Sequence, residues 1–312
     1  MTRRSAPRAT STNEVPLTQA ETIEWLLKRS RRTNRTVPIR RAFVQDTEDG
    51  PILRQKPGPL CQLVRHERAL DLLLLVYAVT SGGDFSVTER AETWGRASGL
   101  SFATDGSASA TVSRQWRKLD DLRLIQRSSE GRFLRVTKLL EDGTGAPYTR
   151  PTGSETTRKD VYFQLPFRYW EDGFHDRLKM PAKVVMLVGM SLRKAKFSIV
   201  PEAYERWYGI SKATLRRGVD QLLKAQMLDE VDEEHFITGE TPTGRGTRTL
   251  YAFRQPYNLN VNKTDRESGR NGKSVEEPFT APAGARTVFS QPASVFLRRV
   301  WSVSTDGTVQ RD

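Results

Sequence analysis

Apolar residues return along this chain first at helical and then at strand spacing, and the whole order occurs twice. Between Leu70 and Tyr77 they recur every three or four positions, which predicts a helix with a wide apolar stripe. A short strand is predicted at Phe85–Val87, followed by two further helices and an alternating, hairpin-like stretch. The same order returns after a helix predicted to begin near Pro181. Such internal repetition predicts two copies of one structural unit.

Capping and turn residues indicate where the helices of each copy begin and end. In the first copy, Thr88 is the expected N-cap of a helix that Gly99 ends. In the second copy, Gly209 ends the corresponding helix and Ser211 caps the next one. A loop of small and polar residues, 101–108, makes the first copy about nine residues longer at this point.

A single shift of 103 positions superimposes the last helices of the two copies. It places Val112 on Leu215 in the apolar stripe, and it places Arg114 on Arg217 on the opposite face. The candidate outward-facing residues are Arg114, Arg117 and Lys118 in the first copy, and Lys212, Arg216, Arg217, Gln221 and Lys224 in the second.

The second copy continues into a long hairpin. A loop rich in Gly and Thr, 239–248, separates its two predicted strands and carries Arg245 and Arg248 as further candidate contacts. Beside it lies an acidic run, which we expect to point away from a phosphate backbone or toward a basic partner, made of Asp229, Glu230, Asp232, Glu233 and Glu234.

The predicted fold is therefore mainly α with small β-hairpins, an α+β protein of two tandem modules with flexible tails. The modules are expected at residues 60–140 and 162–256, joined by a Gly- and Pro-rich linker at 141–161. Residues 1–59 are predicted to form a basic arm with one helix, and residues 257–312 a mostly disordered tail.

Composition narrows the class of partner. A formal charge of +13 and a pI near 10.0 favour a polyanion, and 37% hydrophobic residues suit two small cores better than one large enzyme domain. The longest apolar run, 72–79, is far shorter than the roughly 20 residues of a membrane span. The N-terminus lacks the apolar stretch of a secretory signal, and the lone Cys61 suits a reducing compartment. We therefore predict a cytoplasmic protein with no membrane contact.

The two terminal segments have alternative interpretations. A basic cluster at 28–35 follows a helix that Thr18 and Glu21 are expected to cap. It is either the dipole-matched end of a surface helix or an arm that grips phosphate. Near the other end, the aromatic and basic segment 295–301 is a candidate contact with the body or with a protein partner.

The sequence offers little for catalysis. Three histidines, 66, 175 and 235, lie far apart and Cys61 stands alone, so no metal-ligand spacing is present. The spacing from Gly239 to Gly244 imitates a phosphate-binding loop, but it lacks the Lys and the Ser or Thr that reach phosphate and magnesium. We predict no enzyme activity, no catalytic residues, no metal and no cofactor.

From residue 60 to residue 256, the chain resembles the tandem winged-helix DNA-binding proteins, including bacterial plasmid replication initiators, and each module resembles MarR-like regulators. The segment from Leu119 to Arg127, a helix end followed by a first wing strand, carries the resemblance most specifically. In initiators it implies one module for dimerisation and one for an origin repeat; in regulators it implies dimers on a palindrome. The resemblance thus implies sequence-specific binding of double-stranded DNA and leaves a homodimer open.

An arginine in a recognition helix can bridge guanine N7 and O6, and a glutamine can bridge adenine N6 and N7. Hairpin arginines and the basic arm would mostly contact phosphate or the minor groove. The leading hypothesis is a non-enzymatic DNA-binding protein, acting as a replication initiator or a transcriptional regulator. The alternative is an interaction scaffold whose modules bind protein through the acidic run and the aromatic tail.

Overall fold

The computed structural model describes residues 17–48, 54–100, 107–131, 133–153, 160–237, 242 and 244–261. Within this part of the chain, helices pack around small antiparallel sheets, which confirms the α+β class. No helix among the described residues is long and apolar enough to cross a membrane.

The sequence repeat is also a repeat of structure. We call residues 67–138 the first unit and residues 180–253 the second unit. The first consists of α2 (Glu67–Val79), β4 (Ser86–Glu89), α3 (Ala91–Ala97), α4 (Ser107–Asp121), β5 (Ile125–Glu130) and β6 (Phe133–Lys138). The second consists of α7 (Met180–Leu192), β8 (Phe197–Ser198), α8 (Pro201–Tyr208), α9 (Lys212–Lys224), β9 (Leu228–Ile237) and β10 (Arg245–Phe253).

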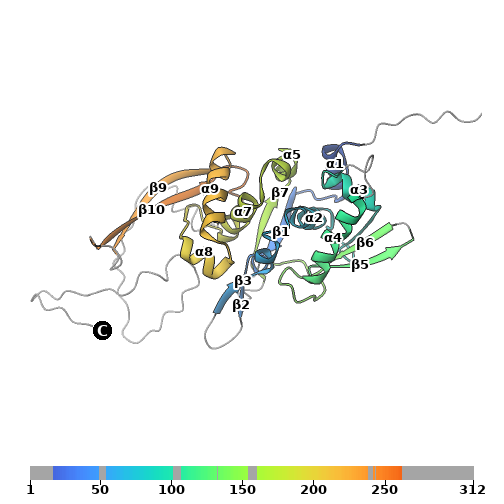
Figure 1. Ribbon diagram of the computed structural model, residues 1–312, viewed down its shortest axis with the longest axis horizontal. Coiled ribbons are helices and arrows are strands. Elements are labelled where there is room, and N and C mark those ends of the chain that lie inside the picture. The colour runs from blue at the N-terminus through green and yellow to red at the C-terminus, as the bar shows by residue number, and fades with distance from the viewer. Residues whose placement is uncertain are drawn as a thin grey trace, which may run out of the picture.

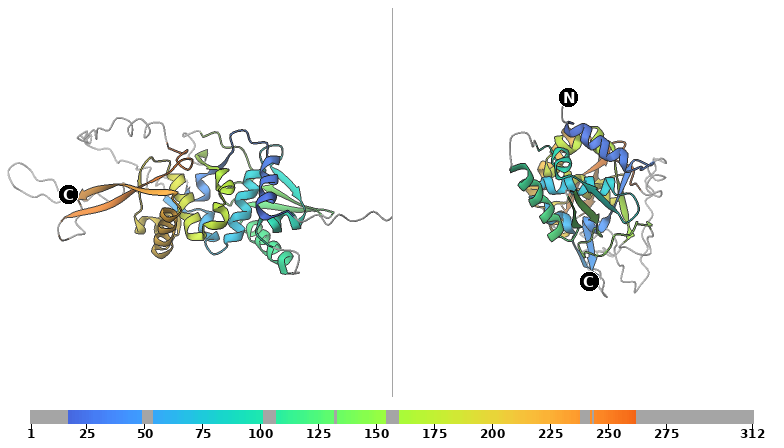
Figure 2. Two further views of the ribbon diagram at one scale, coloured as in Figure 1. Left: turned by 90° about the horizontal axis from the view of Figure 1, so that it is seen from above. Right: turned by 90° about the vertical axis from the view of Figure 1, so that its right-hand side faces the viewer.

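The strands of the two units are ordered alike. In the sheet of the first unit the order is β4-β6-β5, and in that of the second it is β8-β10-β9. The last two strands form an antiparallel hairpin in both, and the short strand before the helix pair joins the hairpin at its last strand. The hairpins project from opposite ends of an elongated molecule (Figures 1 and 2).

The 103-residue register holds at the level of single backbone bonds. Arg123 and Gln226, which are 103 positions apart, both adopt a left-handed conformation with φ 55°. Just after them, the amide of Leu124 donates to the carbonyl of Leu119, and the amide of Met227 donates to that of Leu222, each at 3.1 Å. Both helices therefore end in the same Schellman-like turn.

One predicted cap is wrong and two are correct. Thr88 lies inside β4, and α3 begins only after Arg90, because the strand runs two residues further than its Phe-Ser-Val core indicates. Thr18 and Glu21 do form a reciprocal capping box at the start of α1 (Gln19–Arg29), and the Ser211 hydroxyl accepts from the Thr214 amide at α9.

A central strand pair joins the units. β1 (Thr36–Arg40) runs antiparallel to β7 (Tyr162–Pro166), so that Val37 lies opposite Leu165 and Ile39 opposite Phe163. These four side chains are almost completely buried and belong to one hydrophobic cluster that extends through both units. The units thus share a core instead of meeting through a loose connection (Figure 1).

The described part of the segment predicted as a basic arm, residues 17–48 and 54–59, packs into this body. α1 packs against α3, α2 and α5 (Arg168–Glu171), and Arg32 donates to the carbonyl oxygens of Tyr77, Ala78 and Thr80 at the C-terminal end of α2. Lys28 and Arg29 of the basic cluster lie in the last turn of α1, as the helix-end interpretation expects. The remaining elements of this segment are η1 (Arg41–Phe43), β2 (Gln45–Glu48), β3 (Arg54–Pro57) and η2 (Pro59–Leu63).

The segment predicted as a linker begins with a buried glutamate that forms ion pairs with both neighbouring elements. Glu141 is fully buried and forms 3.0 Å ion pairs with Arg40 of β1 and with Lys138 of β6. Arg40 also pairs with Asp160, so a charged network ties both ends of this segment to the central strands. A short helix, α6 (Phe174–Arg177), then leads into the second unit. The predicted disordered tail lies outside the described residues from 262 onward, and so does the aromatic and basic segment.

Candidate nucleic-acid interface

The last helices of the helix pairs, α4 and α9, lie on one face of the molecule. Both lie toward the viewer in Figure 1, α9 in the left half and α4 in the right, and the view from above places both on that side (Figure 2). The two helices that carry most of the candidate residues therefore lie on the same side of the molecule.

Close backbone packing fixes the orientation of α9. A Cβ atom at Gly218 would lie 2.4 Å from the carbonyl oxygen of Pro181 and 2.6 Å from Val185 Cγ2, so only glycine lets α9 approach α7 this closely. Leu215, Val219 and Leu222 are buried on the same side of the helix, as the periodicity predicted. The opposite side is consequently held toward solvent.

The outward side of α9 carries an excess of positive charge. Arg216, Arg217 and Lys224 are exposed, and none makes an ion pair with another described residue. The Arg217 side chain donates to the Ala213 carbonyl at 3.2 Å, which lays it along the helix. In sequence, α9 contains four basic residues and one acidic residue, so its field is positive along its length.

Bulky packing fixes α4 instead. Trp116 is buried edge-on against Trp94 of α3, with ring centroids 5.3 Å apart, and Val112 and Leu119 complete the buried stripe. Arg114 and Arg117 are exposed and Lys118 is half-buried. Arg114 donates to Thr111 Oγ1 at 3.0 Å within the same helix. The positive charge of α4 is weaker, because two aspartates end the helix.

Two residues predicted on the outward face of α9 have partners within the protein. The Lys212 ammonium lies 2.6 Å from Glu202 Oε1 on α8, and this contact keeps the pKa of the Glu202 carboxyl below its usual value. Gln221 is half-buried, and its Oε1 accepts a hydrogen bond from the Lys179 amide at 3.0 Å. Gln221 therefore anchors the start of α7, which its helical position alone did not reveal.

In the long hairpin, several charged residues that were expected to face a partner form ion pairs within the protein. Arg248 forms a bidentate ion pair with Glu234, with two nitrogen-to-oxygen distances of 2.8 Å. Arg254 pairs in the same way with Asp229 at 2.7 Å, and Lys196 with Asp232 at 2.9 Å. Much of the acidic run is thus neutralised within the sheet, and Arg245 alone of the two hairpin arginines is exposed.

A polar cavity of about 500 Å³ lies beside the start of α2. Residues from α1, α2, α3, α4 and α6 line it, together with Arg65 just before α2 and Lys179 just before α7. Its cations are Arg65, Arg68 and Lys179. Burial lowers the pKa of His66, and the nearby Lys118 charge on α4 lowers it further. Sequence analysis missed these three cations, because they belong to loops and helix ends that the repeat does not align.

Beneath this cavity, a buried lysine connects the units. Lys183 of α7 is fully buried, and its Nζ lies 3.1 Å from Glu67 Oε1 and 2.8 Å from both Asp71 carboxylate oxygens on α2. Burial raises the pKa of Asp71 to about 6, although Lys183 opposes the shift. Within the described residues, no cluster of three metal-ligating side chains is present.

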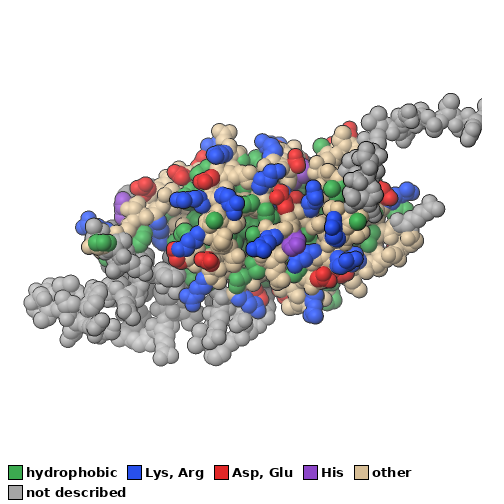
Figure 3. Space-filling view, in the orientation of Figure 1, with side chains coloured by type: hydrophobic (Ala, Val, Ile, Leu, Met, Phe, Trp, Pro, Cys, Tyr) green, Lys and Arg blue, Asp and Glu red, His purple; other side chains and the backbone are tan. Residues whose placement is uncertain are grey.

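The combined surface is cationic from one unit to the other. Lys and Arg side chains spread across this face of the molecule, with carboxylates between them (Figure 3). Such a mixed but predominantly basic face suits an extended anionic partner more than a single small anion.

No protein-family model matches this sequence, and no curated protein matches it either.

Proposed function

We propose that this protein binds double-stranded DNA sequence-specifically through two tandem winged-helix modules, with α9 and α4 as their recognition helices. The observation that carries the proposal is the repeat of helix pair and hairpin, with α4 and α9 on the same side of the molecule and exposed arginines on both helices. In this reading the protein acts without catalysis, as a replication initiator or a transcriptional regulator in the cytoplasm.

The chemistry of the outward faces fits this role. An α-helix fits the major groove of B-DNA, where arginine can form two hydrogen bonds to guanine. Arg216, Arg217 and Lys224 have no competing carboxylate among the described residues, so they reach a groove without first breaking an ion pair. The cations of the polar cavity beside α2, Arg65 and Arg68, would contact the phosphates between the two recognition helices.

The second unit is the stronger candidate for base contacts. Its recognition helix has a surplus of three positive charges, four basic residues against one acidic, whereas α4 has a surplus of one, three basic against two acidic. The first unit would share phosphate contacts or contribute to a homodimer.

A protein-interaction scaffold is the second candidate, and one observation favours it. β9 is an edge strand that carries the acidic run, and Ile237 near its end is 85% exposed. A basic, extended segment of a partner could pair with such an edge. The two candidates make different predictions for the arginines of α9.

The decisive experiment measures binding of the full chain to DNA selected from a random duplex library, at several salt concentrations. We expect nanomolar affinity for the selected site and a steep loss of affinity with salt, because each phosphate contact releases counterions. Replacing Arg216 and Arg217 by alanine should weaken specific binding about a hundredfold. Replacing Arg114 and Arg117 should weaken it about tenfold.

The matched control replaces Lys28 and Arg254 by alanine, which removes the same net charge from two cations already paired with Glu24 and Asp229. Its affinity should stay within about twofold of the parent. Unchanged DNA affinity in the folded α9 variant would reject the proposal and favour the scaffold. Selected sites arranged as direct repeats would indicate initiation, and inverted repeats would indicate regulation.

A further inference from the structure

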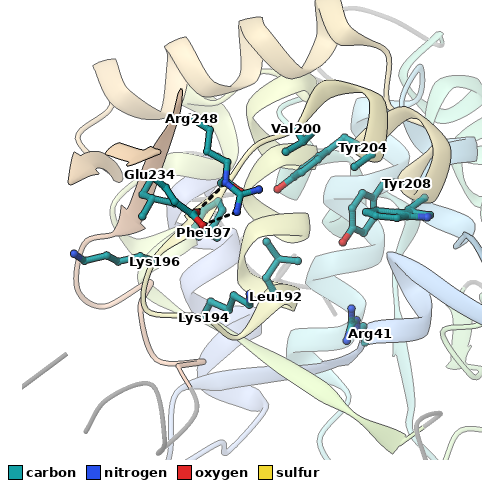
Figure 4. Close-up of a pocket in the computed structure, with 14 residues that line it drawn as sticks. Arg41, Leu192, Lys194, Lys196, Phe197, Val200, Tyr204, Tyr208, Glu234 and Arg248 are labelled. Carbon is teal, nitrogen blue, oxygen red and sulfur yellow. Dashed lines mark hydrogen bonds and ion pairs between the residues drawn. The ribbon is translucent and has the colours of Figure 1, made fainter. Parts of the chain in front are cut away.

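The second unit contains a pocket that the proposed DNA contacts leave unused. It has a volume of about 240 Å³ and lies between α8, the end of α7 and the sheet of the β9–β10 hairpin. Its wall is mostly apolar: Leu192, Phe197 and Val200 face the space in Figure 4, and Leu250 also lines it. A small apolar cavity with a few polar groups is typical of a ligand site.

Two tyrosines of α8 point into this pocket. Tyr204 is 4% exposed and Tyr208 is 1% exposed. The Tyr204 hydroxyl lacks a hydrogen-bond partner among the described residues, whereas the Arg41 guanidinium lies beside the Tyr208 hydroxyl. Both rings extend from α8 toward the space in front of Leu192 (Figure 4). A buried hydroxyl without a partner is costly, so an acceptor supplied by a ligand would relieve that cost.

The charged residues around the pocket favour an anion. Four basic side chains line it against a single carboxylate, and that carboxylate, Glu234, is already bound by Arg248. Lys194 makes no ion pair with any described residue, and the described partners of the Arg41 guanidinium are uncharged, namely the Gln45 amide oxygen at 2.9 Å and the Tyr208 hydroxyl. Burial raises the pKa of Tyr204 well above its usual value, so its hydroxyl remains a donor at physiological pH.

We propose that this pocket binds a small carboxylic acid with a compact apolar body. The body would fill the space between Phe197, Val200 and Leu250, and the carboxylate would accept hydrogen bonds from Tyr204 and an ion pair from Lys194. Because charge-assisted hydrogen bonds in a desolvated site are stronger than neutral ones, the acid should bind better than its neutral counterpart. The inference is independent of DNA binding.

The test uses isothermal titration of the full chain, without DNA, with naphthoate and with naphthylmethanol as its uncharged counterpart. We expect saturable one-to-one binding of naphthoate and at least about tenfold weaker binding of the alcohol. Equal binding of the two probes would overturn the assignment of an anion site. No saturable heat with naphthoate up to about 1 mM would overturn the pocket as a ligand site.

Two substitutions identify the polar contacts. Tyr204→Phe keeps the ring but removes the hydroxyl, and should weaken naphthoate about tenfold while leaving the alcohol nearly unchanged. Lys194→Met should weaken naphthoate about threefold or more. The chain should fold normally in the first variant, since a buried hydroxyl without a partner is removed. Thermal unfolding checks this.

The matched controls remove the same groups elsewhere. Tyr257→Phe deletes another buried hydroxyl without a partner, at a ring packed on Phe174, and Lys28→Met deletes an exposed ammonium paired with Glu24. Both should bind naphthoate like the parent. Parent-like binding in Tyr204→Phe, or equal losses in Tyr204→Phe and Tyr257→Phe, would contradict the proposed contact.

Discussion

The two units follow the same chain path, but they hold their third helices by opposite means. In the first unit the bulk of Trp116 against Trp94 spaces α4 from its neighbours. In the second unit Gly218 brings α9 into backbone contact with α7. A repeated strand order and a repeated helix end thus tolerate different packing beneath them, because side chains of different size can fill the space under the same chain path.

The buried lysines of the two units also differ, in how many cations neutralise the carboxylates beside them. Lys183 neutralises two carboxylates, Glu67 and Asp71, that belong to the other unit. Lys138 shares Glu141 with Arg40, and its ammonium also lies over the rings of two tyrosines. The first arrangement depends on one cation and the second on several.

The largest expected effect follows from this difference. Lys183→Met should lower the free energy of unfolding by about 3 kcal/mol at pH 7, because it leaves two partly buried carboxylates without their cation. Lys138→Met should cost only about 1 kcal/mol, since Arg40 still neutralises Glu141. Urea unfolding of both variants measures the difference.

Equal losses in the two variants would show that the network around Glu141 depends on Lys138 as much as the inter-unit contact depends on Lys183. A second measurement separates charge from packing. The loss in Lys183→Met should shrink as pH falls below about 7, because Asp71 already has a pKa of about 6 beside Lys183 and takes up its proton at a higher pH without that cation.

The second prediction concerns how closely α4 and α9 pack on the helices beneath them. Gly218→Ala should destabilise the protein by about 2 kcal/mol, although alanine normally stabilises a helix interior relative to glycine. The reason is the 2.4 Å approach of a Cβ at this position to the Pro181 carbonyl oxygen. Gln115 lies 103 positions earlier, and Gln115→Ala should change stability by less than about 0.5 kcal/mol.

Thermal unfolding of both alanine variants provides the comparison. A stabilised Gly218→Ala protein would mean that α9 can move away from α7 at little cost. In that case the orientation of α9 would rest on Leu215, Val219 and Leu222 alone.

Much of the repeat could be predicted from sequence, because periodicity records which side of a helix is buried. The stripes through Val112 and Leu215 are buried as expected, and the same shift also aligns the helix ends at Arg123 and Gln226. The strand pair that joins the units could not be predicted, since its two members lie more than a hundred residues apart and were assigned to an arm and to the start of a module.

The candidate surface was less predictable than the core. Helical position indicates which way a side chain leaves the helix, but not whether a carboxylate or amide from another element meets it there. Lys212 and Arg248 have such carboxylate partners, and the Gln221 amide caps a distant backbone group. Arg65 and Lys179 lie far apart in sequence, and only the folded structure brings them to the same cavity.

The dependence of stability on pH also separates the two buried lysine sites. The Asp71 carboxyl has a pKa of about 6 in the folded protein and about 3.8 when unfolded, so it contributes stability below pH 4 that is lost as pH rises toward 6. Burial lowers the pKa of Lys138 to about 8 from 10.5, so its contribution instead improves as pH rises from 8 to 10.5.

Substitution at each site should therefore remove the pH dependence of the free energy of unfolding in a different pH range. Relative to the parent, Asp71→Asn should lose the decline between pH 4 and 6, which is on the order of 2 kcal/mol. Lys138→Met should lose the rise in the free energy of unfolding between pH 8 and 10.5, but it should keep the decline between pH 4 and 6. Urea unfolding at each pH gives both profiles. If Asp71→Asn instead loses stability between pH 4 and 6 as the parent does, the titrating group is another carboxyl. The sites of Lys183 and Lys138 would then not differ in their response to acid.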